Sequence, residues 1–224
     1  TATLPDILKP LRQRRDFTFY DWTERHSSVL YRERHIAPNP EIVMIGNSIT
    51  HYWSGEPSHK TWHAGVDSWN DIFADRNVIN CGYGWDRLGN MMWRMMHEEL
   101  DGFSAKHIFV MAGTNDIYSR TEEAIAEGMV GLIEYIRVKQ PTARIHIVHI
   151  YPRRKAIDRV DKVNATVDEL LKLSDLTNYD IVDVKSVLTK ADGKLDESLF
   201  RDGLHPNEEG YRRIAEVYRK YIQN

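Results

Sequence analysis

The sequence carries three side chains whose types and spacing could together perform acyl transfer. Ser48 stands in Gly46-Asn47-Ser48-Ile49-Thr50, and Asp202 and His205 stand three residues apart near the C-terminus. A serine hydroxyl becomes a nucleophile at neutral pH only when a base takes its proton, and His205 is the candidate base. A carboxylate within reach of the imidazole holds its tautomer and stabilises its cation, which is the role that Asp202 could fill.

Asn115, in Gly113-Thr114-Asn115-Asp116, adds a further group that such a reaction needs. Its side-chain amide can donate a hydrogen bond to the oxyanion that develops during acyl transfer. Taken singly, each signal has a simpler explanation: Ser48 as a helix N-cap, Asn115 as a turn residue, and the Asp–His pair as an exposed loop with a capping histidine. Together, and in this order along the chain, they favour a catalytic site.

Five short apolar runs predict the strands that would position these side chains. They span residues 41–45, 77–81, 107–112, 144–150 and 179–184. Their length and their content of β-branched residues are typical of buried parallel strands. Apolar residues at helical spacing occur over 88–100, 121–136, 160–171 and 211–222. This alternation predicts the α/β class, as a three-layer α/β/α sandwich with a five-stranded parallel sheet.

The predicted sheet also predicts where the reactive side chains meet. Ligands of open α/β sheets bind beyond the carboxyl ends of the strands. Ser48 follows the first predicted strand and Asn115 follows the third. We therefore expect both at one edge of the sheet, with Asp202 and His205 brought there by a late loop.

Length and composition limit the remaining classes. At 224 residues the chain is long enough for one domain with a sizeable core. We expect residues 1–40 to form an N-terminal arm and a helix, near Asp21–Arg34, packed on a domain of residues 41–224. A net charge of −3 argues against nucleic-acid binding, which needs a basic surface. No apolar run approaches the length of a membrane-spanning helix.

The cysteine and histidine content argues against a metal site. Cys81, the single cysteine, excludes an internal disulfide and a thiolate-dominated metal site. His51, His59 and His63 match no zinc spacing, so we expect neither a metal nor another cofactor. The chain begins at Thr1 with no signal-peptide pattern. An export signal trimmed before Thr1 would make the protein extracytoplasmic, and the sequence leaves compartment and oligomeric state open.

At these motifs the chain resembles the SGNH, or GDSL-type, hydrolases, and among them the platelet-activating-factor acetylhydrolase-like branch of serine esterases. Gly46–Thr50 is similar to the family's nucleophile motif, Gly113–Asp116 to the motif of its oxyanion asparagine, and Asp202–Pro206 to its last motif. Asn80–Gly84 and the pair Trp93-Arg94 are similar to that branch's second motif and following helix. The resemblance implies a flavodoxin-like sheet and a catalytic triad with a side-chain oxyanion donor, formed by Ser48, His205, Asp202 and Asn115.

The chain departs from the family pattern in two places. Asn47 stands where the family has an acid before the nucleophile. This position lies outside the proton chain, so activity should survive the change. The family's second oxyanion donor is the backbone N–H of a glycine, and counting back from Trp93-Arg94 places that position on Trp85 rather than Gly84. Both residues therefore stay candidates for the main-chain donor, together with the N–H of Ser48.

The family resemblance implies an ester hydrolase that acts through an acyl-enzyme on Ser48. We expect a short acyl group, acetyl above all, on a carbohydrate or a similar polar alcohol, because no long apolar lid is visible. Indoles can stack on sugar faces, and the candidates for substrate contact are Trp53 and Trp62, with Asn47 and Gly113 beside the motifs.

Two alternatives stay open at this point. A lysophospholipase or thioesterase would use the same side chains on a different acyl donor. A carbohydrate-binding protein without catalysis would result if Trp85 had spoiled the oxyanion hole. In each case the expected partner is a small-molecule or glycan ester or its alcohol.

Overall fold

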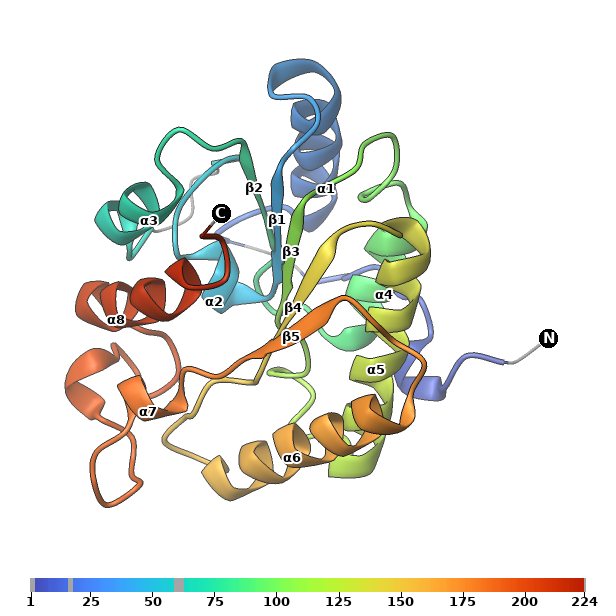
Figure 1. The fold of residues 1–224 in the computed structure, drawn as a ribbon. Helices are drawn as coiled ribbons and strands as arrows, with labels where there is room; N and C mark the ends of the chain where they lie inside the picture. The colour runs from blue at the N-terminus through green and yellow to red at the C-terminus, as the bar shows by residue number, and fades with distance from the viewer. Residues whose placement is uncertain (1–2, 16–17, 59–62, 224) are drawn as a thin grey trace.

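A five-stranded parallel sheet forms the centre of the computed structural model, which describes residues 3–15, 18–58 and 63–223 (Figure 1). The strand order over these residues is β2-β1-β3-β4-β5. Each strand lies within two residues of the bounds that the apolar runs predict. The strands are β1 (Ile42–Gly46), β2 (Val78–Gly82), β3 (His107–Val110), β4 (Arg144–Val148) and β5 (Tyr179–Val182).

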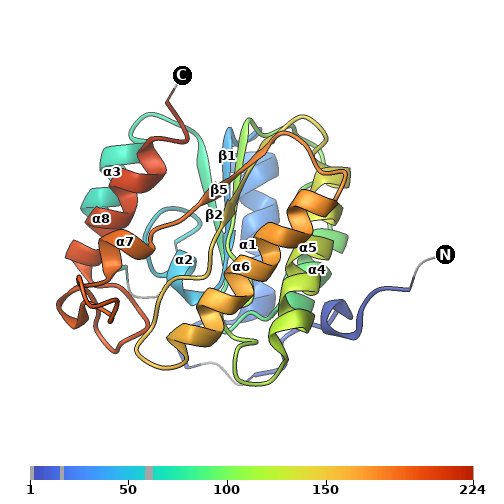
Figure 2. The ribbon, with the colours of Figure 1, turned by 60° about the horizontal axis from the view of Figure 1, so that its bottom comes forward.

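Helices cover both faces of this sheet, which confirms the predicted α/β/α sandwich (Figure 2). One face carries α1 (Trp22–Tyr31), α4 (Leu88–Met96), α5 (Glu122–Lys139) and α6 (Ile157–Leu173). The other face carries α3 (Val66–Phe73), α7 (Lys185–Leu188) and α8 (Glu208–Arg219). The short helices α2 (Ser48–His51) and η3 (Glu197–Leu199) lie in connecting segments.

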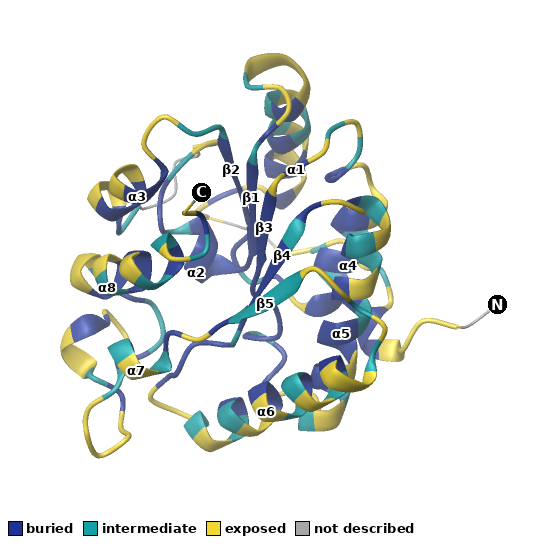
Figure 3. Ribbon diagram, in the orientation of Figure 1, coloured by how far each residue is buried: buried dark blue, intermediate teal, exposed yellow. Residues whose placement is uncertain are grey.

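The strand β1 is apolar on both sides because each side faces a helix layer. Along β1, Val43 and Ile45 join the core under α4, α5 and α6, whereas Ile42 and Met44 join the core under α3 and α8. All four side chains are at most 2% exposed. Successive side chains of a strand point to opposite faces, so a doubly covered strand reads as a continuous apolar run. Figure 3 shows β1, β2 and β3 as buried strands, whereas the edge strand β5 is mostly half-buried.

The N-terminal arm contributes to this core. Its short helix η1 (Asp6–Leu8) packs on α4 and α5, and the Leu8 side chain is fully buried. A Cβ on Gly89 of α4 would lie 2.6 Å from the carbonyl oxygen of Lys9, so only glycine admits the arm so closely. The helix expected near Asp21–Arg34 is α1, whose N-cap Asp21 accepts from the N–H of Glu24.

The strand order reverses direction at the edge where the sequence predicts the site. The chain leaves β1 towards β2 on one side and pairs β1 with β3 on the other, so the direction of winding reverses at β1. Ligands of such sheets bind at this point, beyond the carboxyl ends. Three loops start there: Asn47 and α2 after β1, Tyr83–Arg87 after β2, and Met111–Arg120 after β3.

Candidate active site

Ser48 is the first residue of α2, directly after the turn that ends β1. The N-cap of this helix is Asn47, whose Oδ1 accepts from the N–H of Ile49 at 3.0 Å. A Cβ on Gly46 would lie 2.0 Å from Thr50 Oγ1, so the turn requires glycine there. The simpler explanation of Ser48 as a cap therefore does not hold, because Asn47 does the capping and leaves the serine hydroxyl for another role.

His205 and Asp202 lie in the loop before α8 and reach the Ser48 hydroxyl. Ser48 Oγ is 2.9 Å from His205 Nε2, and His205 Nδ1 is 2.7 Å from Asp202 Oδ2. With Nδ1 donating to the carboxylate, Nε2 is the nitrogen that can accept the serine proton. The structure thus brings together the three side chains that the sequence singles out.

The Asp202 carboxylate is held by its own loop. Its Oδ1 accepts from the N–H groups of Leu204 and His205, at 3.0 and 2.7 Å. Partial burial acts to raise the pKa of Asp202, but the bonds from the main chain and the ring of His205 outweigh burial and hold this pKa below its ordinary value. The carboxylate therefore stays charged at neutral pH and can stabilise an imidazolium.

Asn115 lies half-buried after β3, with one amide N–H donating to the carbonyl oxygen of Asp86 at 2.8 Å. Gly113 makes the preceding turn with φ of +96°, which glycine adopts at no steric cost. A Cβ there would lie 3.0 Å from the Ile125 side chain of α5. Gly113 is therefore a backbone requirement that faces the core, and the substrate contact expected for it does not fit this position.

The two candidates for the main-chain donor, both in the loop after β2, differ in hydrogen bonding and backbone conformation. The N–H of Gly84 donates to His51 Nδ1 at 3.1 Å. Trp85 has φ of +63°, the left-handed conformation that favours glycine. The structure thus gives Trp85 the backbone conformation that suits the glycine expected at this position. The Trp85 indole stacks with Phe19 and Tyr20 of the arm, and the Arg15 guanidinium lies 4.4 Å from its ring centre.

A buried ion pair holds the next residue of this loop. The Asp86 carboxylate accepts from Arg94 Nε at 2.9 Å and from the Trp22 indole N–H at 2.8 Å. Arg94 also pairs with Glu99, and all three charged side chains are fully buried. Burial raises the pKa of Asp86 to about 6, against the lowering effect of Arg94. In the sequence, only the pair Trp93-Arg94 points to this network, and no pattern identifies Asp86 and Glu99 as its partners.

The structure does not support the substrate contacts expected for Trp53 and Asn47. Trp53 is 1% exposed, packs among core aromatics and donates its indole N–H to Ser68 Oγ, so it is a core residue and the expectation is wrong. Asn47 is also fully buried beneath the serine and does not fit a substrate contact. Trp62 lies outside the described residues. Tyr52, which the prediction passed over, has its ring 5.5 Å from that of His205.

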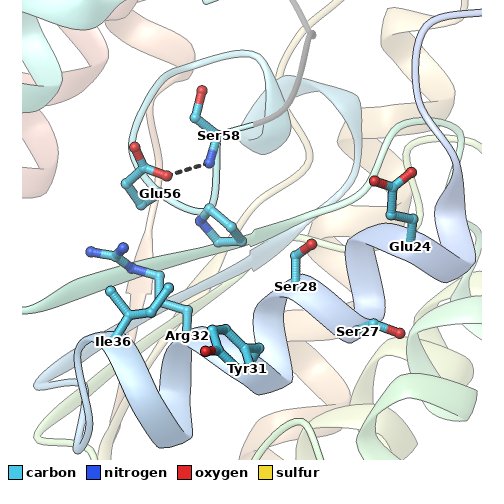
Figure 4. Close-up of a pocket in the computed structure, with 9 residues that line it drawn as sticks. Glu24, Ser27, Ser28, Tyr31, Arg32, Ile36, Glu56 and Ser58 are labelled. Atoms are coloured by element: carbon cyan, nitrogen blue, oxygen red, sulfur yellow. Dashed lines mark hydrogen bonds between the residues drawn. The ribbon is translucent and has the colours of Figure 1, made fainter.

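A groove of about 830 Å³ lies apart from these side chains, between α1, the π-helical turn η2 (Arg32–Ile36) and the segment Glu56–Ser58. Figure 4 shows Tyr31, Arg32 and Ile36 on one side of it and Glu56 and Ser58 on the other. Its lining contains no member of the Ser48, His205 and Asp202 group. The groove and the reactive centre are therefore separate features.

Within residues 3–15, 18–58 and 63–223, no group of three or more His, Cys, Asp or Glu side chains is arranged to hold a metal ion. No described helix has the length and apolar character to cross a membrane.

Known sequences resemble the chain over most of its length. A sequence model of the GDSL-like Lipase/Acylhydrolase family matches residues 44–213. The alpha2 subunit of platelet-activating factor acetylhydrolase IB from Homo sapiens is 26% identical over 185 residues, which cover 82% of this chain and 76% of that protein. The alpha1 subunit from Rattus norvegicus is 26% identical over 178 residues, covering 79% of this chain and 72% of its own.

Solved structures share the fold. A member of the lipolytic protein G-D-S-L family from Veillonella parvula superposes with a TM-score of 0.63 at 25% identity, covering 81% of this chain and 97% of its own. Est24, a carbohydrate acetylesterase from Sinorhizobium meliloti, superposes with a TM-score of 0.61 at 15% identity, covering 82% of this chain and 98% of its own. The second likeness is one of fold alone.

Proposed function

Since the chain belongs to the GDSL-like lipase/acylhydrolase family and is a hydrolase that acts on esters, we propose that it removes a short acyl group, acetyl above all, through an acyl-enzyme on Ser48. The observation that carries this proposal is the 2.9 Å contact between Ser48 Oγ and His205 Nε2, with Asp202 on the other ring nitrogen. Hydroxyl, base and orienting carboxylate are the parts that activate a serine.

The proposed reaction has two acyl-transfer steps. Ser48 Oγ attacks the ester carbonyl carbon while His205 Nε2 takes the hydroxyl proton, and Asp202 stabilises the imidazolium. His205 then gives this proton to the leaving alcohol oxygen as the ester bond breaks. Water enters, loses a proton to His205 and attacks the acyl-enzyme, which releases the carboxylic acid and restores the serine.

Three donors are proposed to stabilise the oxyanion. The N–H of Ser48 belongs to the first turn of α2, where helix N–H groups have no partner within the helix. The second amide N–H of Asn115 is assigned here, because the first is bound to Asp86. For the main-chain donor we choose Trp85 over Gly84, since His51 engages the N–H of Gly84. Each donor of this kind contributes roughly 10²–10³ to kcat in acyl-transfer enzymes.

The names of the relatives and two aromatic side chains support the substrate class. The alpha1 and alpha2 subunits reported above belong to an acetylhydrolase by name, and Est24 is by name a carbohydrate acetylesterase. Tyr52 beside His205, and Trp85 in the loop after β2, could contact a sugar ring in place of Trp53. We therefore propose an acetyl ester of a carbohydrate or similar polar alcohol as the substrate.

Hydrolysis of p-nitrophenyl esters of increasing chain length tests both parts of the proposal. We expect the acetate to be cleaved, with rates that fall steeply beyond about four carbons, and we expect Ser48→Ala to lose the activity. Ser27→Ala, an exposed serine of α1, is the matched control and should keep it. Equal rates for Ser48→Ala and the parent would refute the serine mechanism.

Release of acetate from acetylated sugars tests the carbohydrate substrate separately from the serine chemistry. Cleavage of p-nitrophenyl acetate without cleavage of any acetylated sugar would reject the carbohydrate substrate and leave the serine chemistry intact. A higher rate on long-chain esters than on acetate would favour the lysophospholipase or thioesterase alternative instead.

A further inference from the structure

The peptide unit that joins Gly84 to Trp85 is held by two side chains of the N-terminal arm. Its carbonyl oxygen, on Gly84, accepts from the Tyr20 hydroxyl at 2.6 Å and from Gln13 Nε2 at 2.9 Å. Tyr20 is 5% exposed, so its hydrogen bond forms out of contact with bulk water. Both bonds span more than sixty residues of sequence and arise only from the fold.

The geometry of a peptide bond links these contacts to the proposed oxyanion hole. A trans peptide is planar, so the C=O of Gly84 and the N–H of Trp85 point in opposite directions. A donor that fixes the carbonyl direction therefore fixes the direction of the N–H as well. Hydrogen bonds to the carbonyl also polarise the amide, which makes its N–H a stronger donor.

We propose that Tyr20 and Gln13 are positioning residues of the oxyanion hole, which aim and polarise the Trp85 N–H through the carbonyl of Gly84. The inference rests on the proposed function and on the choice of Trp85 as main-chain donor. Neither side chain touches the substrate in this account, so neither is catalytic. Both lie before residue 44, outside the part of the chain that the family model matches.

The neighbouring contacts explain why this peptide needs such support. Trp85 is held at φ of +63°, a region that is unfavourable for a residue other than glycine. Such a conformation persists only when the surroundings fix it. Here the arm fixes it from one side through Tyr20 and Phe19 against the indole, while His51 fixes the preceding N–H.

The same arm also reaches the second proposed donor, Asn115. Gln13 Nε2 bonds both the Gly84 carbonyl and Asp86 Oδ1, and the Trp22 indole N–H bonds that same carboxylate oxygen. The carbonyl of Asp86 in turn accepts from the Asn115 amide. The segment 84–86 therefore holds one donor and orients another, and Gln13 and Trp22 help to fix its place.

Tyr20→Phe tests the inference, because it removes one hydroxyl and keeps the ring that stacks on Trp85. We expect kcat for p-nitrophenyl acetate to fall about tenfold, as one lost hydrogen bond predicts, with KM within twofold of the parent. Affinity for a trifluoromethyl ketone, which adds to Ser48 and forms an oxyanion, should fall by the same factor. Gln13→Ala should act in the same direction and more weakly, since the Tyr20 bond remains.

Tyr218→Phe is the matched control. It also removes a buried tyrosine hydroxyl, which bonds Tyr151 at 2.7 Å under α8, away from segment 84–86. We expect a lower melting temperature with kcat and ketone affinity unchanged. If Tyr20→Phe keeps the parent kcat, or if Tyr218→Phe loses as much activity, the positioning role is overturned.

The activity of Ser48→Ala distinguishes a failure of the positioning role from a failure of the proposed function. If Ser48→Ala is inactive while Tyr20→Phe and Gln13→Ala have parental kcat and ketone affinity, the serine chemistry stands and the positioning role falls. If Ser48→Ala matches the parent, the proposed function itself falls, and with it this inference. Should Tyr20→Phe fail to fold, Gln13→Ala, which alters a half-exposed side chain, decides the question alone.

Discussion

Two His–Asp pairs in this molecule have nearly the same geometry and different surroundings. In the candidate active site, His205 Nδ1 lies 2.7 Å from Asp202. Within the sheet, His146 Nδ1 of β4 lies 2.6 Å from Asp180 of β5. The far nitrogen of His205 meets the Ser48 hydroxyl, whereas that of His146 meets His107 of β3, each at 2.9 Å.

The comparison teaches that the pair alone does not make a catalyst. His146 side chain is 1% exposed and lies between Phe109 and Tyr221, where no substrate can approach it. His107, its second partner, offers no hydroxyl to activate. The His205 side chain is 18% exposed and its Nε2 faces the hydroxyl of Ser48, the residue after the turn that ends β1. Two features therefore distinguish a catalytic pair from a structural one. They are the group that faces the second ring nitrogen and the exposure of the histidine to solvent.

The largest effect is expected on kcat when each of the two histidines is replaced by glutamine. His205→Gln should lower kcat by about 10³-fold or more, because the serine loses its base. His146→Gln should leave kcat within twofold and lower the free energy of unfolding by about 1–3 kcal/mol, since Asp180 and His107 lose a buried partner. Steady-state kinetics and urea denaturation measure the two effects. Similar losses of kcat in both variants would remove the distinction between the pairs.

A smaller effect concerns stability against pH. Burial, and then the neighbouring His146, lower the pKa of His107 to about 4 in the folded chain, against about 6.5 when unfolded. Between these values the unfolded chain binds a proton that the folded chain does not, so stability falls as the pH drops from about 6.5 towards 4. We expect His107 to account for a loss on the order of 2 kcal/mol between pH 7 and pH 5.

Urea denaturation of the parent and of His107→Gln at pH 7 and pH 5 checks this effect. The variant has no proton to gain at this position, so its stability should change less between the two pH values. An equal change in parent and variant would show that His107 does not titrate in this window. The comparison of two proteins cancels the contributions of other groups, such as His149, whose pKa is raised by Asp183 and Asp168 against the effect of burial.

The fold could be predicted because its signals are local. Strands covered on both sides become unbroken apolar runs, and the runs at 107–112 and 144–150 ended at the carboxyl edge within two residues of β3 and β4. The Ser48, Asn115, Asp202 and His205 group could be predicted because the sheet rule brings strand ends together. A residue's type and its place after a strand are both visible in the sequence.

What the sequence could not resolve depends on contacts between distant residues or on backbone angles. Nothing near Trp53 indicates that its indole N–H bonds Ser68 inside a cluster of aromatic rings rather than facing a crevice. The choice between Gly84 and Trp85 rests on a dihedral angle and on the bond to His51. Tyr20 reaches the carbonyl oxygen of Gly84 across 64 residues, and no spacing rule covers such a contact.

The identity of the nucleophile is tested most directly by covalent trapping. The protein is incubated with a p-nitrophenyl alkylphosphonate, which phosphonylates activated serines, and the adduct is located by tandem mass spectrometry. The account predicts a single adduct on Ser48, absent from Ser48→Ala and formed far more slowly in His205→Gln. An adduct on another residue, or labelling of His205→Gln at the parent rate, would contradict it.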